Sequence, residues 1–141
     1  MNGDAGDDYM RGDAGDDIMN GADGHDRLQG GSGFDLLMGG EGNDTLAGGN
    51  ESDELHGGAG DDSLNGGKGD DTIVGGTGAD SVRADTGNDE IIAGVGRDTI
   101  DAGAGNDCSI AAVYPIVASA SVNGVTTNTG NYFVIARVSP N

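Results

Sequence analysis

Carboxylates recur at a fixed spacing along most of this 141-residue chain. Carboxylate oxygens are the ligands that hard divalent cations prefer, and calcium takes about six to eight oxygens in a flexible geometry. Aspartate is also common in solvated turns, but twelve aspartates in one register make that explanation a poor one. The spacing therefore predicts a row of calcium sites. The aspartates occur at every ninth position: Asp8, Asp17, Asp26, Asp35, Asp44, Asp53, Asp62, Asp71, Asp80, Asp89, Asp98 and Asp107.

The nine-residue unit around each aspartate reads Gly-Gly-x-Gly-x-Asp-x-apolar-x, most clearly in residues 57–65 and 66–74. Twelve such units run from Gly3 to Ile110 without an insertion or deletion. Glycine supplies backbone angles that are closed to other residues, so the first six positions are predicted to turn. The last three positions alternate polar, apolar, polar, which predicts a very short strand with one inward side chain. The inward position is apolar in every unit except the last, where it is Ser109.

This unit resembles the calcium-binding nonapeptide of the RTX (repeats-in-toxin) family, and the resemblance covers residues 3–110. It implies an all-β, right-handed parallel β-roll in which two successive units make one turn, so that odd and even units stack in separate sheets. It also implies that calcium lies between stacked turns, bound by the sixth-position aspartates and by backbone carbonyls of the glycine-rich turns. The glycines concerned are Gly31, Gly33, Gly40, Gly42, Gly49, Gly58, Gly60, Gly67, Gly69, Gly76, Gly78, Gly94, Gly96, Gly103 and Gly105.

The charge of the chain agrees with this expectation. Pairing each unit with the second unit after it gives ten aspartate pairs, from Asp8 with Asp26 to Asp89 with Asp107, so we expect about ten calcium ions. Residues 1–110 contain all 25 acidic residues and five of the six basic ones, a formal charge of −20 that about ten divalent ions would nearly neutralise. With 30 glycines and an apolar content of only 34%, the metal-free repeat block is predicted to be disordered. Calcium binding would then supply its folding free energy.

Other kinds of chemistry find no support in the sequence. It contains no G-x-S-x-G, H-E-x-x-H or P-loop motif, so no enzymatic activity is predicted. The lone Cys108 excludes an internal disulfide. No apolar run approaches a membrane span and no secretory signal opens the chain. A net charge of −19 also argues against nucleic acid or an anionic membrane as partner.

Several units depart from the consensus. Ala84, Ala93 and Ala102 replace the first glycine, and because alanine demands ordinary backbone angles we expect distorted calcium sites near the C-terminal end. Glu51 replaces the fourth glycine. It is expected either to spoil the turn that carries Asp53, or to compensate with its own carboxylate. At the second position, glycine is replaced by Asp4, Asp13 and Asp85.

The outer faces of the two expected sheets differ. Odd units present mainly polar side chains, whereas even units present more apolar surface than solubility requires. The hypothesis is that the even sheet docks a partner roll or the chain's own tail. The apolar residues of this face are Ile18, Leu36, Met38, Val74, Ile92 and Ile110.

The composition changes abruptly after Ile110, which divides the chain into a β-roll over residues 1–110 and a second segment over 111–141. Two β-rich runs, 113–122 and 132–138, flank a glycine-containing turn region and predict a hairpin. Three roles for this segment stay open. It could cap the roll, as repeat arrays require, or contain a C-terminal secretion signal, since RTX-like proteins typically leave by a type I exporter. It could also pair with another molecule.

These observations favour a calcium-binding structural module of a secreted or cell-surface protein that folds on leaving the cell. Extracellular calcium sites bind at about 10⁻⁴ to 10⁻³ M, which suits such a switch. Two alternatives remain open. The bare N-terminal sheet edge could be covered by another subunit to build a head-to-tail filament, or the chain could be the C-terminal module of a larger secreted enzyme.

Overall fold

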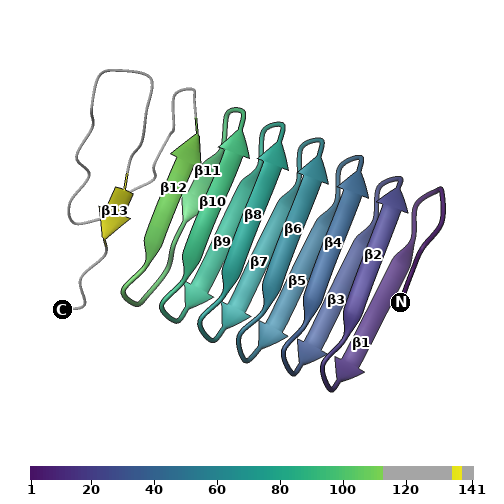
Figure 1. Cartoon of the computed structure of the whole chain (residues 1–141), viewed down its shortest axis with the longest axis horizontal. Coiled ribbons are helices and arrows are strands. Elements are labelled where there is room, and N and C mark those ends of the chain that lie inside the picture. Colours follow the sequence, from purple (N-terminus) through teal and green to yellow (C-terminus); the bar gives the residue numbers. More distant parts are fainter. Residues whose placement is uncertain (113–134, 138–141) are drawn as a thin grey trace.

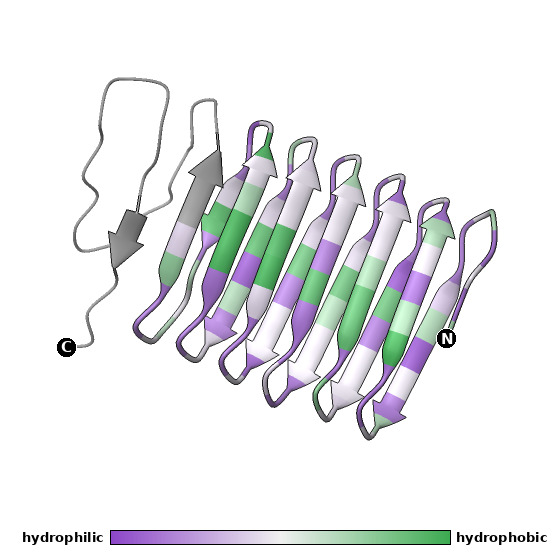
Figure 2. Cartoon of the chain, in the orientation of Figure 1, coloured by the Kyte–Doolittle hydropathy of each residue, from purple (hydrophilic) through white to green (hydrophobic). Residues whose placement is uncertain are grey.

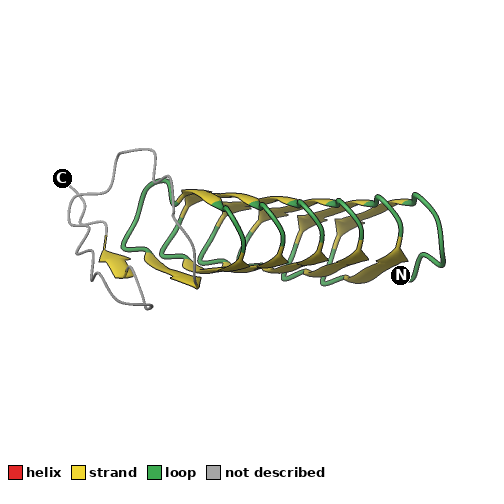
Figure 3. Ribbon diagram, turned by 90° about the horizontal axis from the view of Figure 1, so that it is seen from above, coloured by secondary structure: helices red, strands yellow, loops and turns green. Residues whose placement is uncertain are grey.

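The computed structural model describes residues 1–112 and 135–137, and within these ranges every regular element is a β-strand. The strands form two flat sheets that lie opposite each other, with turns along both edges (Figures 1 and 3). The fold is therefore the all-β roll predicted from the repeats, with about six turns. The strands are β1 (Tyr9–Ala14), β2 (Ile18–Asp23), β3 (Arg27–Ser32), β4 (Leu36–Glu41), β5 (Thr45–Asn50), β6 (Glu54–Ala59), β7 (Ser63–Lys68), β8 (Thr72–Thr77), β9 (Ser81–Thr86), β10 (Glu90–Val95), β11 (Thr99–Asp101), β12 (Cys108–Ala112) and β13 (Ile135–Arg137).

Odd and even strands belong to separate sheets, as the resemblance to RTX repeats implied. The odd sheet has the order β1-β3-β5-β7-β9-β11, and the even sheet has the order β13-β12-β10-β8-β6-β4-β2. All neighbours from β1 to β12 pair in parallel with equivalent residues side by side, as in Met10 opposite Leu28, except that the β10–β12 pair shifts its register between Ile92 and Val95. Each aspartate consequently lies one turn from the aspartate 18 residues away.

The strands are longer than the sequence predicted. Most have six residues and continue through the first three positions of the next unit, as β7 does from Ser63 to Lys68. The prediction of a three-residue strand was wrong because the second-position residue pairs within the sheet although its φ is positive, +111° at Gly67. Glycine tolerates this conformation without a steric penalty. The glycine-rich motif thus serves both as strand end and as turn.

The core is one column of side chains from each sheet. The inward apolar residues from Met10 to Ile100 are buried, and in Figure 2 the hydrophobic segments form a band across the strands. Ala84, Ala93 and Ala102 are buried with them. No first-position residue among the described units has a positive φ, so the expectation that alanine there conflicts with the backbone angles was wrong. Ser109 ends the column and is 9% exposed.

Only part of the predicted C-terminal hairpin can be compared with the structure. Residues 113–134 and 138–141 lie outside the described part of the chain. Strand β13 (Ile135–Arg137) pairs antiparallel with β12, with Ser109 opposite Ala136. A segment of the tail therefore covers the last parallel strand of the even sheet.

Candidate metal centres

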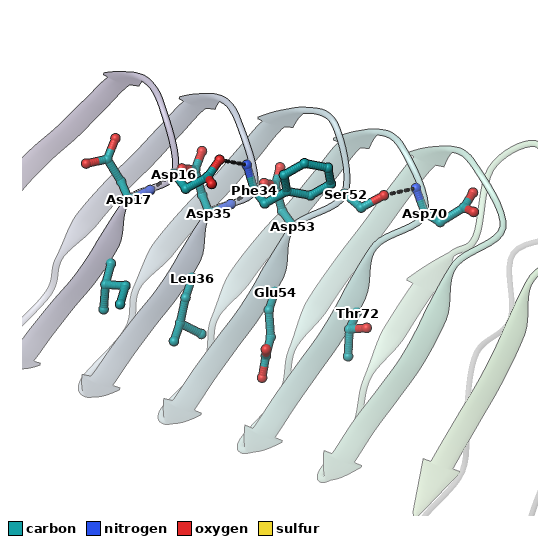
Figure 4. Close-up of a pocket in the computed structure, with 11 residues that line it drawn as sticks. Asp16, Asp17, Phe34, Asp35, Leu36, Ser52, Asp53, Glu54, Asp70 and Thr72 are labelled. Atoms are coloured by element: carbon teal, nitrogen blue, oxygen red, sulfur yellow. Dashed lines mark hydrogen bonds between the residues drawn. The ribbon is translucent and has the colours of Figure 1, made fainter.

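The sixth-position aspartates form a continuous ladder along each edge of the roll. In every one of the ten predicted pairs, Oδ1 of the later aspartate accepts a hydrogen bond from the backbone N–H of the aspartate one turn earlier, at 2.8 to 3.1 Å. Figure 4 shows this arrangement at Asp17, Asp35 and Asp53. The structure thus brings together all the carboxylates that the spacing paired.

Burial separates these aspartates into two groups. Asp8 and Asp17 are half-buried, because no turn precedes them in the stack. The ten aspartates from Asp26 to Asp107 are buried, each at most 4% exposed. Nine of them have an Oδ2 atom that is buried without a hydrogen-bond partner: those of Asp26, Asp35, Asp44, Asp53, Asp62, Asp71, Asp80, Asp89 and Asp107. An unpartnered buried carboxylate oxygen is costly unless a cation compensates it.

Backbone carbonyls face the same spaces between turns. A Cβ atom added at second-position Gly49 would lie 2.2 Å from the carbonyl oxygen of Gly31, one turn earlier. At the fourth position, a Cβ atom on Gly60 would lie 2.1 Å from the carbonyl oxygen of Gly42. Glycine at Gly49 and Gly60 avoids this collision with the preceding turn, although Asp85 and Glu51 hold the same two positions in other units with positive φ. At the fourth position these carbonyls lie near the carboxylates, since a Cβ atom on Gly105 would meet both the carbonyl oxygen of Gly87 and Oδ1 of Asp107.

The electrostatics of these carboxylates are unfavourable without a cation. Burial is the main cause that raises the pKa of Asp71 to about 7, and the carboxylates of Asp89 and Asp53 raise it further, against the hydrogen bond from the Asp53 N–H. Burial likewise raises the pKa to about 6 at Asp53, Asp62 and Asp89, and raises the pKa of Asp35, Asp44 and Asp80. Ion pairs in residues 1–112 join Arg11 to Asp13 and Arg83 to Asp85, and His56 Nε2 lies 2.7 Å from Glu54 Oε1. None of these contacts involves a sixth-position aspartate.

The donor set fits calcium. No cluster of three or more histidine, cysteine or acidic side chains occurs in the described ranges, so a site built from side chains alone is absent there. Each space between turns instead combines two stacked carboxylates with carbonyl oxygens, which is an all-oxygen environment suited to a hard cation of flexible coordination. The aspartates and the second- and fourth-position carbonyls are the groups that would bind it.

A second ladder was not predicted from the sequence. Side chains at the fifth position accept a hydrogen bond from the backbone N–H of the fifth-position residue one turn later, the reverse of the direction in the aspartate ladder. Figure 4 shows two such bonds, from Phe34 N–H to Asp16 and from Asp70 N–H to Ser52. The acceptors are Asp7, Asp16, His25, Asn43, Ser52, Asp61, Asp70 and Asn88. The recurrence of small polar residues at this position was the available signal.

Units that depart from the consensus keep the geometry of the turn. Glu51 adopts φ +70°, and its Oε2 accepts a hydrogen bond from the Gly33 N–H at 3.0 Å. The expected spoiling of its turn is not observed, because Asp53 remains buried and bonded to the Asp35 N–H. Ala22, a departure that sequence reasoning missed, occupies the second position with φ +84°.

Comparison with known proteins agrees with this geometry. The family model of the RTX calcium-binding nonapeptide repeat matches four times, over residues 1–28, 20–54, 47–82 and 74–107. No curated protein and no solved structure gives a match. A helix long and apolar enough to cross a bilayer is not found in the described residues. The chain belongs to the RTX calcium-binding nonapeptide repeat family, whose repeats bind calcium and are typical of secreted bacterial proteins.

Proposed function

We propose that this chain is a non-enzymatic module that folds when calcium binds to it outside the cell. The observation that carries the proposal is the row of ten buried aspartates, nine of which have an unpartnered Oδ2 atom. Because stacked buried carboxylates repel one another, the folded roll is unfavourable at neutral pH until cations lie between them. Ligand binding to the folded state alone then stabilises that state.

The stoichiometry follows from the ladder. Ten stacked aspartate pairs provide for about ten calcium ions, one for each space between turns. Sites with dissociation constants of about 10⁻⁴ to 10⁻³ M would remain empty in the cytosol and fill outside the cell. The chain would be exported unfolded, with a type I exporter as the route, and would fold on the cell surface or in the medium.

Calcium titration tests this function. Far-ultraviolet circular dichroism should show a largely unfolded chain in chelator at neutral pH and a sheet-rich chain at millimolar calcium, while calorimetry on the same samples counts the ions. Magnesium is the control, since it demands a stricter octahedral geometry and dehydrates reluctantly. A chain that stays compact and sheet-rich in chelator would contradict the proposal.

A second candidate function is association through the outer face of the even sheet. This face carries four half-buried apolar side chains, those of Leu36, Met38, Val74 and Ile92, and Ile18 is 62% exposed. Its acidic residues, Glu54 and Glu90, are few for so acidic a chain. Ile110 continues the row by its pairing with Ile92. A second roll is the occupant we propose, because this face brings little charge repulsion against a copy of itself. Replacing Leu36 and Ile92 with glutamate should abolish a calcium-dependent dimer in sedimentation; an unchanged mass would contradict the proposal.

A further inference from the structure

The first position of each unit distinguishes the two ends of the roll. It is glycine in the first nine units, from Gly3 to Gly75, and alanine in the last three, at Ala84, Ala93 and Ala102. This position points inward beside the carboxylate of its own unit, and the three alanines are buried. Any side chain placed there must share space with a metal-binding aspartate.

In the glycine units the carboxylate occupies that space. A Cβ atom added at Gly21 would lie 2.2 Å from Oδ2 of Asp26, and one added at Gly57 would lie 2.4 Å from Oδ2 of Asp62. Real Cβ atoms essentially never approach another atom closer than 3.0 Å. In the alanine units, the methyl group needs the space that Oδ2 occupies in the glycine units. The two groups cannot share it, so the carboxylate of an alanine unit cannot lie where it does in a glycine unit.

The hydrogen bonds of the aspartate ladder persist in the alanine units. The bonds that Asp26, Asp35 and Asp44 accept measure 2.8 to 2.9 Å. In the alanine units Asp89, Asp98 and Asp107 accept bonds of 2.9, 3.0 and 3.1 Å, and Asp80, in a glycine unit, accepts one of 3.0 Å. Oδ1 therefore keeps its hydrogen-bond partner in both kinds of unit, so the effect of the methyl group falls on Oδ2, the oxygen beside the first position.

We propose that Asp89, Asp98 and Asp107 belong to a separate, weaker class of calcium sites, and that the methyl groups of Ala84, Ala93 and Ala102 define this class. The inference rests on the proposed function. Groups that position a metal-binding side chain commonly change metal affinity by about 10- to 100-fold, so we expect dissociation constants about tenfold higher at these three sites than at the others. The C-terminal turns would then be the last to bind calcium as its concentration rises.

Amide exchange on the full chain can assign calcium binding to individual pairs. The backbone N–H groups of Asp71, Asp80 and Asp89 donate to the carboxylates of the alanine units, so their protection reports on the proposed weak sites. Two-dimensional NMR at increasing calcium should show these three N–H groups becoming protected at about tenfold higher calcium than those of Asp8 and Asp26. Simultaneous protection of all ten N–H groups would overturn the proposal.

Two variants test the cause. Replacing all three alanines with glycine (Ala84→Gly, Ala93→Gly, Ala102→Gly) should bring the three late N–H groups back to the calcium concentration of the others. Ala47→Gly, which removes a methyl group from the outer face of β5, is the matched control and should leave the order unchanged. Conversely, Gly57→Ala should delay protection of the Asp44 N–H, which bonds Asp62. If the N–H groups became protected in the same order as in the unmodified chain in both the triple variant and Gly57→Ala, the inference would be overturned. Absence of calcium binding to the unmodified chain would instead overturn the proposed function itself.

Discussion

Adjacent aspartates in this chain differ in the environment of their carboxylates. Asp61 is exposed, and its Oδ1 accepts the Ala79 N–H at 2.7 Å. Asp62 is 2% exposed, its Oδ1 accepts the Asp44 N–H, and its Oδ2 has no partner. Only the second residue of such a pair carries a charge that water does not solvate, so only that residue depends on a bound cation.

This difference predicts opposite outcomes for two neighbouring substitutions. Asp62→Asn removes the charge from a carboxylate shared by the pairs with Asp44 and Asp80, so we expect one to two fewer calcium ions and a calcium midpoint for folding raised about tenfold. Asp61→Asn keeps an amide oxygen that can accept the Ala79 N–H and should leave both quantities unchanged. Calorimetry measures the first quantity and circular dichroism the second. Equal effects of the two substitutions would contradict the assignment of the sixth position.

Ala22 is a residue whose replacement should stabilise the fold. Its φ of +84° lies in the left-handed region, which costs a non-glycine residue about 1–2 kcal/mol. Ala22→Gly relieves this strain at a smaller cost in unfolded-state entropy, so the calcium-loaded free energy of unfolding should rise by about 0.5–1 kcal/mol. Gly40→Ala is the reciprocal test, and it should destabilise by more, since its Cβ atom would lie 2.1 Å from the Ala22 carbonyl oxygen. Urea unfolding at saturating calcium measures both changes; a destabilised Ala22→Gly would contradict the argument.

At the scale of strands and turns, the sequence predicts the features that depend on residue spacing, which are the inward-facing positions and the stacking of equivalent residues. A nine-residue period with aspartate and an apolar residue two positions apart determines which residues lie inward, and the parallel register places Asp8 beside Asp26. The extent of β7 through Gly66 and Gly67 was not predictable in this way, because it requires strand pairing by a residue with positive φ. The fifth-position ladder was missed because its bonds depend on side-chain direction across a turn of 18 residues, and because Asp, Asn, Ser and His all serve as acceptors.

The fifth-position ladder should contribute to stability independently of calcium. Asn43→Ala removes the acceptor of the Asp61 N–H, which bonds at 2.9 Å, and should cost about 0.5–1 kcal/mol. Ala79→Asn should have the opposite effect, because it offers an acceptor to the Arg97 N–H at a place where the ladder is interrupted. Asn65→Ala, on the exposed outer face of β7, is the control. Thermal unfolding at saturating calcium measures these changes, and equal losses for Asn43→Ala and Asn65→Ala would show that the ladder contributes nothing.

At the scale of the whole molecule, the rows of buried aspartates decide how stability responds to protons as well as to calcium. Burial raises the pKa of Asp71 to about 7 and of Asp53, Asp62 and Asp89 to about 6. In the unfolded chain these groups titrate near pH 4, about their ordinary value. The metal-free folded state therefore binds protons more tightly than the unfolded state does.

The sign of the pH effect follows from this linkage. A group with a raised pKa stabilises the fold most below its unfolded pKa, and this contribution is lost as the pH rises through its folded pKa. In chelator, sheet content should thus increase as the pH falls from about 8 to about 5, while calcium affinity should decrease over the same range because protons compete for the carboxylates. Circular dichroism in chelator, with sedimentation to exclude aggregation, measures the first effect. Asp71→Asn should make the metal-free chain more stable at high pH and less dependent on pH, whereas Asp70→Asn, which changes the exposed neighbour, should not. A metal-free chain that is equally unfolded at about pH 8 and about pH 5 would show that buried charge is not what prevents the roll from folding. Calcium would then act by some means other than neutralising these aspartates.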